Sequence, residues 1–154
     1  MNNQIIMWSM LIIPWFTLPF MKKDSIKRFS PAIILTALIV TITHEIAHAF
    51  RWWIALDSIV PWGYITNISY SYGLFLVGTY WVFHFTYRRF WLYMLLNTAI
   101  GGLWVFPILH FLERMKIFQY VNINEWFLWL INIIIALIIY SYQVWHDHIF
   151  SLKD

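Results

Sequence analysis

One short motif in this 154-residue chain has the residue types and the spacing of a zinc site. Residues 44–48 read His-Glu-Ile-Ala-His, the pattern H-E-x-x-H. On a helix, His44 and His48 project from the same face and could offer two imidazoles to one zinc ion. Glu45 would then lie beside a metal-bound water and accept its proton. The motif therefore predicts hydrolysis, with Glu45 as the catalytic residue and the two histidines as metal ligands.

A catalytic zinc needs a third protein ligand and keeps one open position. His110 and Glu113 are spaced to share a helix face at the end of a later apolar stretch, at the same predicted depth as the motif. Asp57, in a loop on the same side, is a further candidate. We expect the helices that carry His44 and His110 to pair along these polar faces, because a polar group facing lipid costs several kcal/mol, roughly.

The motif resembles that of membrane-embedded zinc proteases of the site-2 type. The resemblance covers five residues. That family also has a later transmembrane signature of the Asn-Pro-Asp-Gly type, whose aspartate binds the metal. The nearest stretch here, residues 97–102, reads Asn-Thr-Ala-Ile-Gly-Gly and contains no aspartate. This departure counts against protease activity.

The composition limits the class of protein more firmly than the motif does. Hydrophobic residues make up 62% of the chain and charged residues 11%, whereas soluble domains contain about 45–50% apolar and about 25% charged residues. A soluble enzyme, a disordered chain and a nucleic-acid-binding module are excluded. The absence of cysteine excludes disulfides and thiolate metal sites. The sequence indicates an integral membrane protein whose first partner is the lipid bilayer.

The apolar stretches predict an all-α membrane bundle of about five transmembrane helices, forming one multi-pass domain over residues 1–154. A helix needs about 20 apolar residues to cross a hydrocarbon core of about 30 Å. Pro31 is expected in the first turn of the second helix, where a missing N–H costs nothing. The ionisable residues separate five such stretches, at residues 5–21, 30–50, 65–87, 91–112 and 126–145.

Loop charges predict the orientation, because Lys and Arg close to helix ends favour the cytoplasmic side. Trp and Tyr gather toward the predicted helix ends, as expected for aromatic belts at the lipid headgroups. The sequence therefore predicts a cell-membrane protein with its N-terminus outside and its C-terminus in the cytoplasm. Seven basic residues fall on the predicted inner side (Lys22, Lys23, Lys27, Arg28, Arg88, Arg89 and Lys153), and three fall on the outer side (Arg51, Arg114 and Lys116).

A second resemblance covers most of the chain. The length, the basic loop after the first helix and an aromatic C-terminal pattern look like a family of small multi-pass proteins from spore-forming Firmicutes. This resemblance implies a membrane protein with no assigned activity. The pattern consists of Leu112, Glu113, Tyr120, Trp126, Trp129, Tyr140 and Trp145.

Three function classes remain open. The chain is predicted first to be a scaffold or a partner subunit for other membrane proteins, with no nucleic-acid role. His44 and His48 then make polar contacts with neighbouring helices, and Glu45 pairs with Arg51 or Arg114. The alternatives are a zinc-dependent metallohydrolase and a carrier of a small molecule or an ion. Residues within the predicted helices are interpreted as packing residues: Asn67, Asn97, Asn132, Gly73, Gly78, Gly101 and Gly102. The run of residues 146–148 is interpreted as a solvated helix end.

Overall fold

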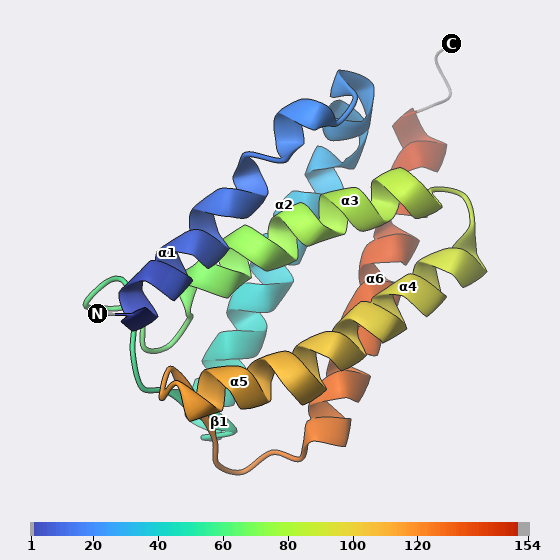
Figure 1. Cartoon of the computed structure of the whole chain (residues 1–154). Helices are drawn as coiled ribbons and strands as arrows, with labels where there is room; N and C mark the ends of the chain where they lie inside the picture. Colours follow the sequence, from blue (N-terminus) through green and yellow to red (C-terminus); the bar gives the residue numbers. More distant parts are fainter. Residues whose placement is uncertain (1, 151–154) are drawn as a thin grey trace.

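A computed structural model describes residues 2–150 of the chain as a bundle of long helices (Figure 1). The chain is 76% helical, which confirms the all-α class. Two π-helical segments, Tyr70–Phe75 and Trp104–Ile108, precede α3 and connect α4 to α5, and a 3-10 turn, Leu18–Phe20, follows α1. The helices are α1 (Asn2–Trp15), α2 (Lys23–Ala49), α3 (Leu76–Thr86), α4 (Phe90–Leu103), α5 (Leu109–Arg114) and α6 (Glu125–Phe150).

Three helices among the described residues are long and apolar enough to cross a membrane: Lys23–Ala49, Phe90–Arg114 and Glu125–Phe150. They correspond to the second, fourth and fifth predicted spans. The other two predicted spans, residues 5–21 and 65–87, contain shorter helices. The α1 helix has 14 residues, with Pro14 near its end, and α3 has 11 residues after its π-helical segment of six.

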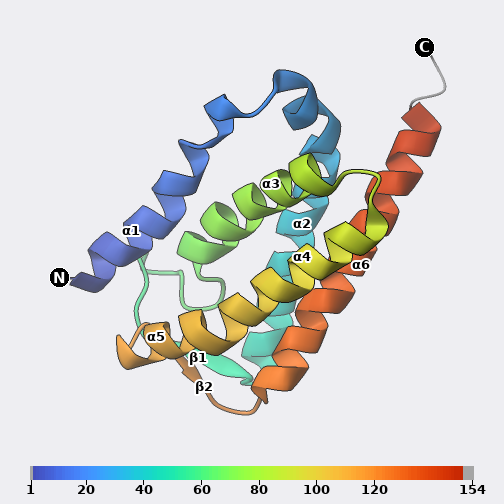
Figure 2. The ribbon, with the colours of Figure 1, turned by 45° about the vertical axis from the view of Figure 1, so that its right-hand side comes forward.

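Four of the helices form a ring. The α2 helix packs against α3 and α6, and α4 packs against the same two neighbours, so that α2 and α4 lie diagonally across the bundle (Figure 2). The expected pairing of the helices that carry His44 and His110 is therefore wrong. Instead, the indole of Trp129 on α6 packs on Gly101 and Gly102 of α4 and donates a hydrogen bond to the Thr98 carbonyl at 3.0 Å.

The α1 helix lies outside the ring, against α3 and the π-helical segment that precedes it (Figure 1). Gly73 makes this close approach possible. A Cβ at Gly73 would lie 2.1 Å from the carbonyl oxygen of Met10 and 2.7 Å from Cα of Leu11. The backbones of the two helices thus touch at this glycine.

A two-stranded sheet closes one end of the bundle, which we call the sheet end. Strand β1 (Trp53–Ala55) pairs antiparallel with β2 (Phe118–Tyr120), with Trp53 opposite Tyr120. The sequence analysis did not predict these strands. Three residues are too few to show the alternation of apolar and polar side chains that identifies a strand.

At the opposite end, which we call the basic end, α2 begins earlier and α6 ends later than predicted. Lys23, Lys27 and Arg28 lie in the first turns of α2 rather than in a loop, and Pro31 lies in the helix interior. Residues 146–148 belong to α6, and the interpretation as a solvated end is wrong for Asp147, whose side chain is only 16% exposed.

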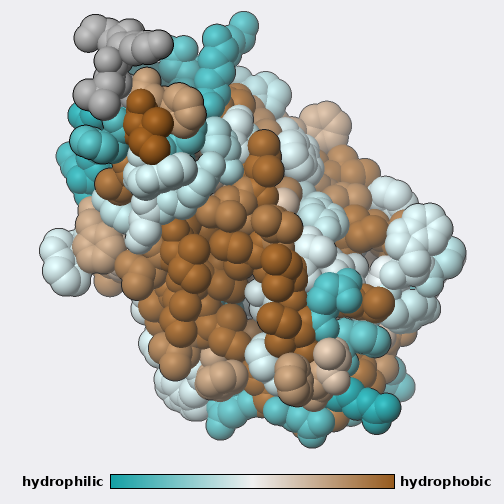
Figure 3. Space-filling model, turned by 180° about the vertical axis from the view of Figure 1, so that it is seen from behind, coloured by the Kyte–Doolittle hydropathy of each residue, from teal (hydrophilic) through white to brown (hydrophobic). Residues whose placement is uncertain are grey.

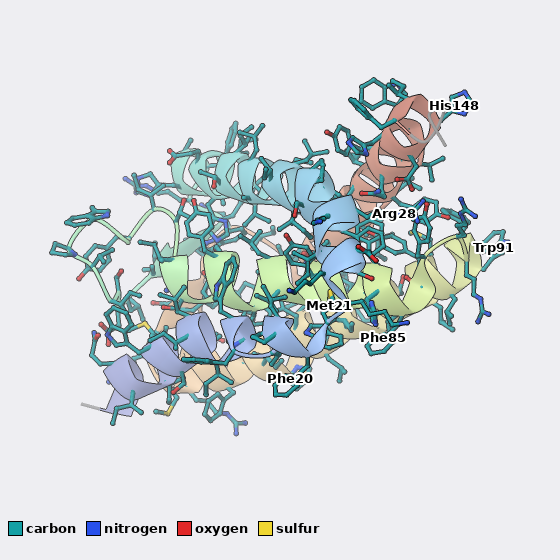
Figure 4. All side chains as sticks on the ribbon, turned by 90° about the horizontal axis from the view of Figure 1, so that it is seen from above. Phe20, Met21, Arg28, Phe85, Trp91 and His148 are labelled. Atoms are coloured by element: carbon teal, nitrogen blue, oxygen red, sulfur yellow. The ribbon has the colours of Figure 1, made fainter. Side chains whose placement is uncertain are left out.

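The Asp147 carboxylate joins three helices at the basic end. Arg28 of α2 lies 3.4 Å from it, between the start of α2 and α6 (Figure 4). Gln143 donates a hydrogen bond to it at 3.0 Å, and Tyr87, after α3, donates another.

Charged residues within the part of the chain that the structure describes lie at these two ends. Lys153 lies outside the described residues. Seen from behind, the middle of the molecular surface is hydrophobic, with hydrophilic residues above and below it (Figure 3). The basic end carries Lys22, Lys23, Asp24, Lys27, Arg28, Arg88, Arg89 and Asp147, and the sheet end carries Glu45, Arg51, Asp57, Glu113, Arg114, Lys116 and Glu125.

Candidate functional site: a cavity inside the helix ring

The residues of the H-E-x-x-H motif lie in different environments. His44 is buried, whereas Glu45 and His48 are exposed. Nδ1 of His44 lies 2.8 Å from the Val40 carbonyl oxygen, so this nitrogen is the donor, and Nε2 lies 3.4 Å from Oγ of Ser71. The two imidazoles are therefore not presented together to one metal ion.

The candidate third ligands have other partners. His110 is exposed, and its Nε2 lies 3.1 Å from the Glu125 carboxylate. Asp57 accepts hydrogen bonds from the side-chain amides of Asn3 and Gln4, both at 3.2 Å, and so connects α1 to the loop after β1. Glu113 is half-buried.

These positions leave the zinc hypothesis without geometric support. No three His, Asp or Glu side chains among residues 2–150 lie close enough together to hold a metal ion. The alternative pairing of Glu45 with Arg51 or Arg114 is also not observed. The ion pairs found in residues 2–150 are Arg28–Asp147 and His110–Glu125.

The buried imidazole of His44 instead contributes to a cavity of about 150 Å³ inside the ring of α2, α3, α4 and α6. No charged side chain lines it. Its walls are largely apolar, with a few polar side chains from several elements. These include His44 and Thr36 of α2, Tyr70 of the first π-helical segment, Asn97 of α4, Trp104 of the second π-helical segment and Asn132 of α6.

Several polar atoms in these walls have no protein partner. Tyr70 and Trp104 are buried residues that line the cavity, and neither the hydroxyl nor the indole N–H is among the fully buried atoms of residues 2–150 that lack a partner. Because neither group makes a hydrogen bond within residues 2–150, both retain some exposure to the cavity. Asn97 and Asn132 donate to carbonyls of their own helices, at 2.9 and 3.1 Å, which leaves each side-chain oxygen free to accept. The walls therefore offer both donors and acceptors to an occupant.

The two π-helical segments frame the cavity on the side of the sheet end. Their wider turns present Tyr70 and Phe75 from one segment and Trp104 from the other, with ring centroids 5.2 Å (Tyr70–Trp104) and 5.1 Å (Phe75–Trp104) apart. In the second segment, Pro107 has no N–H to give to the preceding turn, which breaks the α-helical hydrogen-bond pattern. Such π-helical turns occur frequently at functional sites.

An aromatic cluster closes the cavity toward the basic end. The ring centroids of Phe83 and Tyr93 are 5.0 Å apart, and those of Tyr93 and Tyr140 are 4.8 Å apart. The Tyr93 hydroxyl donates a 3.0 Å hydrogen bond to the Ala136 carbonyl, which fixes its ring between α4 and α6. At the sheet end, Trp53 and Phe118 of the two strands form the floor.

The sequence analysis found one of these residues, His44, but for a different chemistry. Asn97 and Asn132 were interpreted as packing residues, and Tyr70 and Trp104 were not singled out. The available signal was the set of polar side chains on stretches predicted to be buried in the membrane, which are functional candidates by default.

No protein-family model matches the chain, and searches of the curated proteins and of the solved structures find no match either.

Proposed function

We propose that this chain is an integral protein of the cell membrane, with five passes, an outer N-terminus and a cytoplasmic C-terminus. The outer face of α2 supports membrane embedding. Ile34, Leu38, Ile42 and Ile46 recur every four residues and are all exposed, so they form an apolar stripe along the helix. Apolar surface of this kind is stabilised by hydrocarbon at roughly 25 cal/mol per Å².

The ends of the bundle fit the two headgroup regions. Trp126 and Trp145 of α6 are both exposed, and 19 residues of helix separate them by about 28 Å. This spacing matches a hydrocarbon core of about 30 Å with an aromatic belt on each side. Basic residues outnumber acidic ones at the basic end, which supports its assignment to the cytoplasm.

Within this membrane bundle, we propose that the function is to bind a small uncharged molecule in the cavity, as a carrier or a receptor does. The observation that carries the proposal is the set of donors and acceptors without a protein partner around a partly enclosed volume. A cavity of about 150 Å³ accommodates a molecule close to benzene in size. The absence of a charged lining residue favours an uncharged molecule over an ion, since a charge without a partner is costly in a low-dielectric interior.

The other two function classes become outcomes of the same test. A scaffold or partner subunit for other membrane proteins would have no specific occupant in the cavity. A zinc hydrolase would need Glu45 and His48, which lie outside the cavity lining.

Phenol is a suitable probe because it combines an aromatic ring with one hydroxyl. We expect the full chain in lipid nanodiscs to bind phenol saturably by titration calorimetry, with empty nanodiscs as the reference, and not to bind benzoate, which is charged. Tyr70→Phe should weaken phenol binding about 5- to 10-fold, since one hydrogen bond contributes about 1 kcal/mol. The matched control is Tyr64→Phe, at an exposed tyrosine outside the cavity.

Two results would contradict the proposal. One is phenol uptake that rises linearly in the manner of bilayer partitioning, and the other is equal binding by the Tyr70 and Tyr64 variants. Either result favours the scaffold.

A further inference from the structure

The cavity is only partly enclosed, and its opening lies between α3 and α4. Leu74, in the π-helical segment that precedes α3, is 36% exposed, and Ile100 of α4 is 45% exposed. Both residues also line the cavity. A residue that lines a cavity and is also exposed marks the place where that cavity meets the surroundings. The opening is therefore on the side of the bundle, away from both charged ends.

Two aromatic contacts limit the opening along the helix axes, one between the two π-helical segments and one between α3 and α4. Phe75 and Trp104 touch on the side of the sheet end, and Phe83 and Tyr93 touch on the side of the basic end. Phe75 and Phe83 are eight residues apart, which corresponds to about 12 Å of helix. Between these contacts the two helices leave a window, which we call the α3–α4 window.

Gly78 keeps the α3–α4 window open from the side of α3. It lines the cavity between the two aromatic contacts, and a Cβ built on it would meet no atom within 4 Å. A helical glycine without a close neighbour does not serve helix packing, and it lowers helix stability by about 0.5–1 kcal/mol relative to alanine. Helix packing therefore does not explain why position 78 is a glycine with empty space beside it.

We propose that the α3–α4 window is a lateral entrance through which an uncharged amphiphile enters the cavity from the hydrocarbon region of the bilayer. This inference rests on the proposed function and specifies its ligand. The polar head of the amphiphile binds the unpartnered groups around Tyr70, Asn97 and Asn132. Its apolar tail lies in the window, against Leu74 and Ile100, and extends into the lipid.

The chemistry on the two sides of the window selects this class of molecule. The rim is apolar and opens at the middle of the apolar belt, so only molecules that dissolve in hydrocarbon reach it. The interior holds donors and acceptors but no charge, so a hydroxyl or an amide is bound and an ionised group is not. A tail longer than the cavity is accommodated only if the opening faces lipid.

Tail length therefore tests the entrance separately from the cavity. The probes are phenol and 4-hexylphenol, titrated against the full chain in nanodiscs, with bound probe corrected for partitioning into empty nanodiscs. We expect the wild-type chain to bind both probes. Gly78→Leu, which fills the α3–α4 window, should weaken 4-hexylphenol binding at least 10-fold and phenol binding much less.

The matched control is Ala99→Leu, which adds similar bulk at an exposed position of α4 outside the cavity lining and should bind both probes like the wild type. Ile100→Trp narrows the α3–α4 window from the opposite helix and replaces Gly78→Leu if that variant does not fold by circular dichroism. It should show the same selective loss of 4-hexylphenol.

Three results would contradict the proposed lateral entrance. If the wild type binds phenol but rejects 4-hexylphenol, the cavity does not open to lipid, although the proposed function stands. If Gly78→Leu binds 4-hexylphenol like Ala99→Leu, the route lies elsewhere. If the wild type binds neither probe, the entrance and the proposed function fail together.

Discussion

Gly73 and Gly78 lie on one continuous helix, yet their surroundings are opposite. A Cβ at Gly73 would collide with the backbone of α1, whereas a Cβ at Gly78 would meet nothing within 4 Å. The first glycine allows two helices to touch, and the second borders the cavity. In the sequence both glycines suggest close helix packing. The difference shows that the position of the neighbouring helix decides whether a glycine in a membrane helix allows close packing or borders a cavity.

Gly73→Ala should have the largest effect on stability. The atoms in its way are backbone atoms of Met10 and Leu11, which cannot rotate aside as a side chain can. The whole of α1 must therefore move away from the ring. We expect the free energy of unfolding to fall by about 3 kcal/mol, at the upper end of the cost of overpacking.

The measurement is reversible unfolding of the purified chain in mixed detergent micelles, followed by circular dichroism. Gly102→Ala is the matched control, because its Cβ would lie 3.6 Å from the Trp129 indole, an ordinary contact distance. Equal stability of the two variants would show that α1 does not pack on Gly73.

A similar contrast separates the two histidines of the H-E-x-x-H motif. His44 packs at 5.5 Å from the Trp53 ring and 5.8 Å from the Tyr70 ring, while His48 is exposed. We expect His44→Ala to lower the free energy of unfolding by about 2 kcal/mol, since it leaves a void and removes the partner of Ser71. His48→Ala should change it by less than about 0.5 kcal/mol.

The same two variants show which interpretation of the motif is correct. A zinc site would make both substitutions destabilising and would make the wild-type stability sensitive to a chelator. Unfolding curves recorded with and without a chelator, on protein grown with added zinc, provide the comparison. A chelator-dependent loss of stability in the wild type alone would support the zinc hypothesis over the structural role of His44.

The sequence predicted the long helices well and the interior of the bundle poorly. The spans 30–50, 91–112 and 126–145 were found because long apolar runs end at charged residues, and α2, α4–α5 and α6 match them within a few residues except at the start of α2 and the end of α6. Those two ends were missed because Arg28 and Asp147 are ionisable, and ionisable residues were used to end a span. The structure pairs them with each other.

The candidate site could not be predicted, because it depends on which side chains face inward. Residues four apart on a helix differ by about 40° in direction. After His44, the buried stripe of α2 continues at Ala47 rather than at His48. Polar wall residues come from α2, α4, α6 and the two π-helical segments, and no local pattern specifies the order of these elements around the ring. The two π-helical segments also shift the direction of every side chain that follows them.

Gly78→Ala should have a smaller effect than Gly73→Ala or His44→Ala, and its sign is opposite to theirs. A methyl group enters open space beside α3, so no packing is lost. Alanine also restricts the unfolded chain and favours the helix, which stabilises the fold by about 0.5–1 kcal/mol. In the unfolding assay used for Gly73→Ala, the Gly78→Ala variant should require a higher fraction of the denaturing detergent than the wild type does. A loss of stability comparable to that of Gly73→Ala would mean that the space beside Gly78 is occupied in the membrane, and the contrast between the two glycines would then disappear.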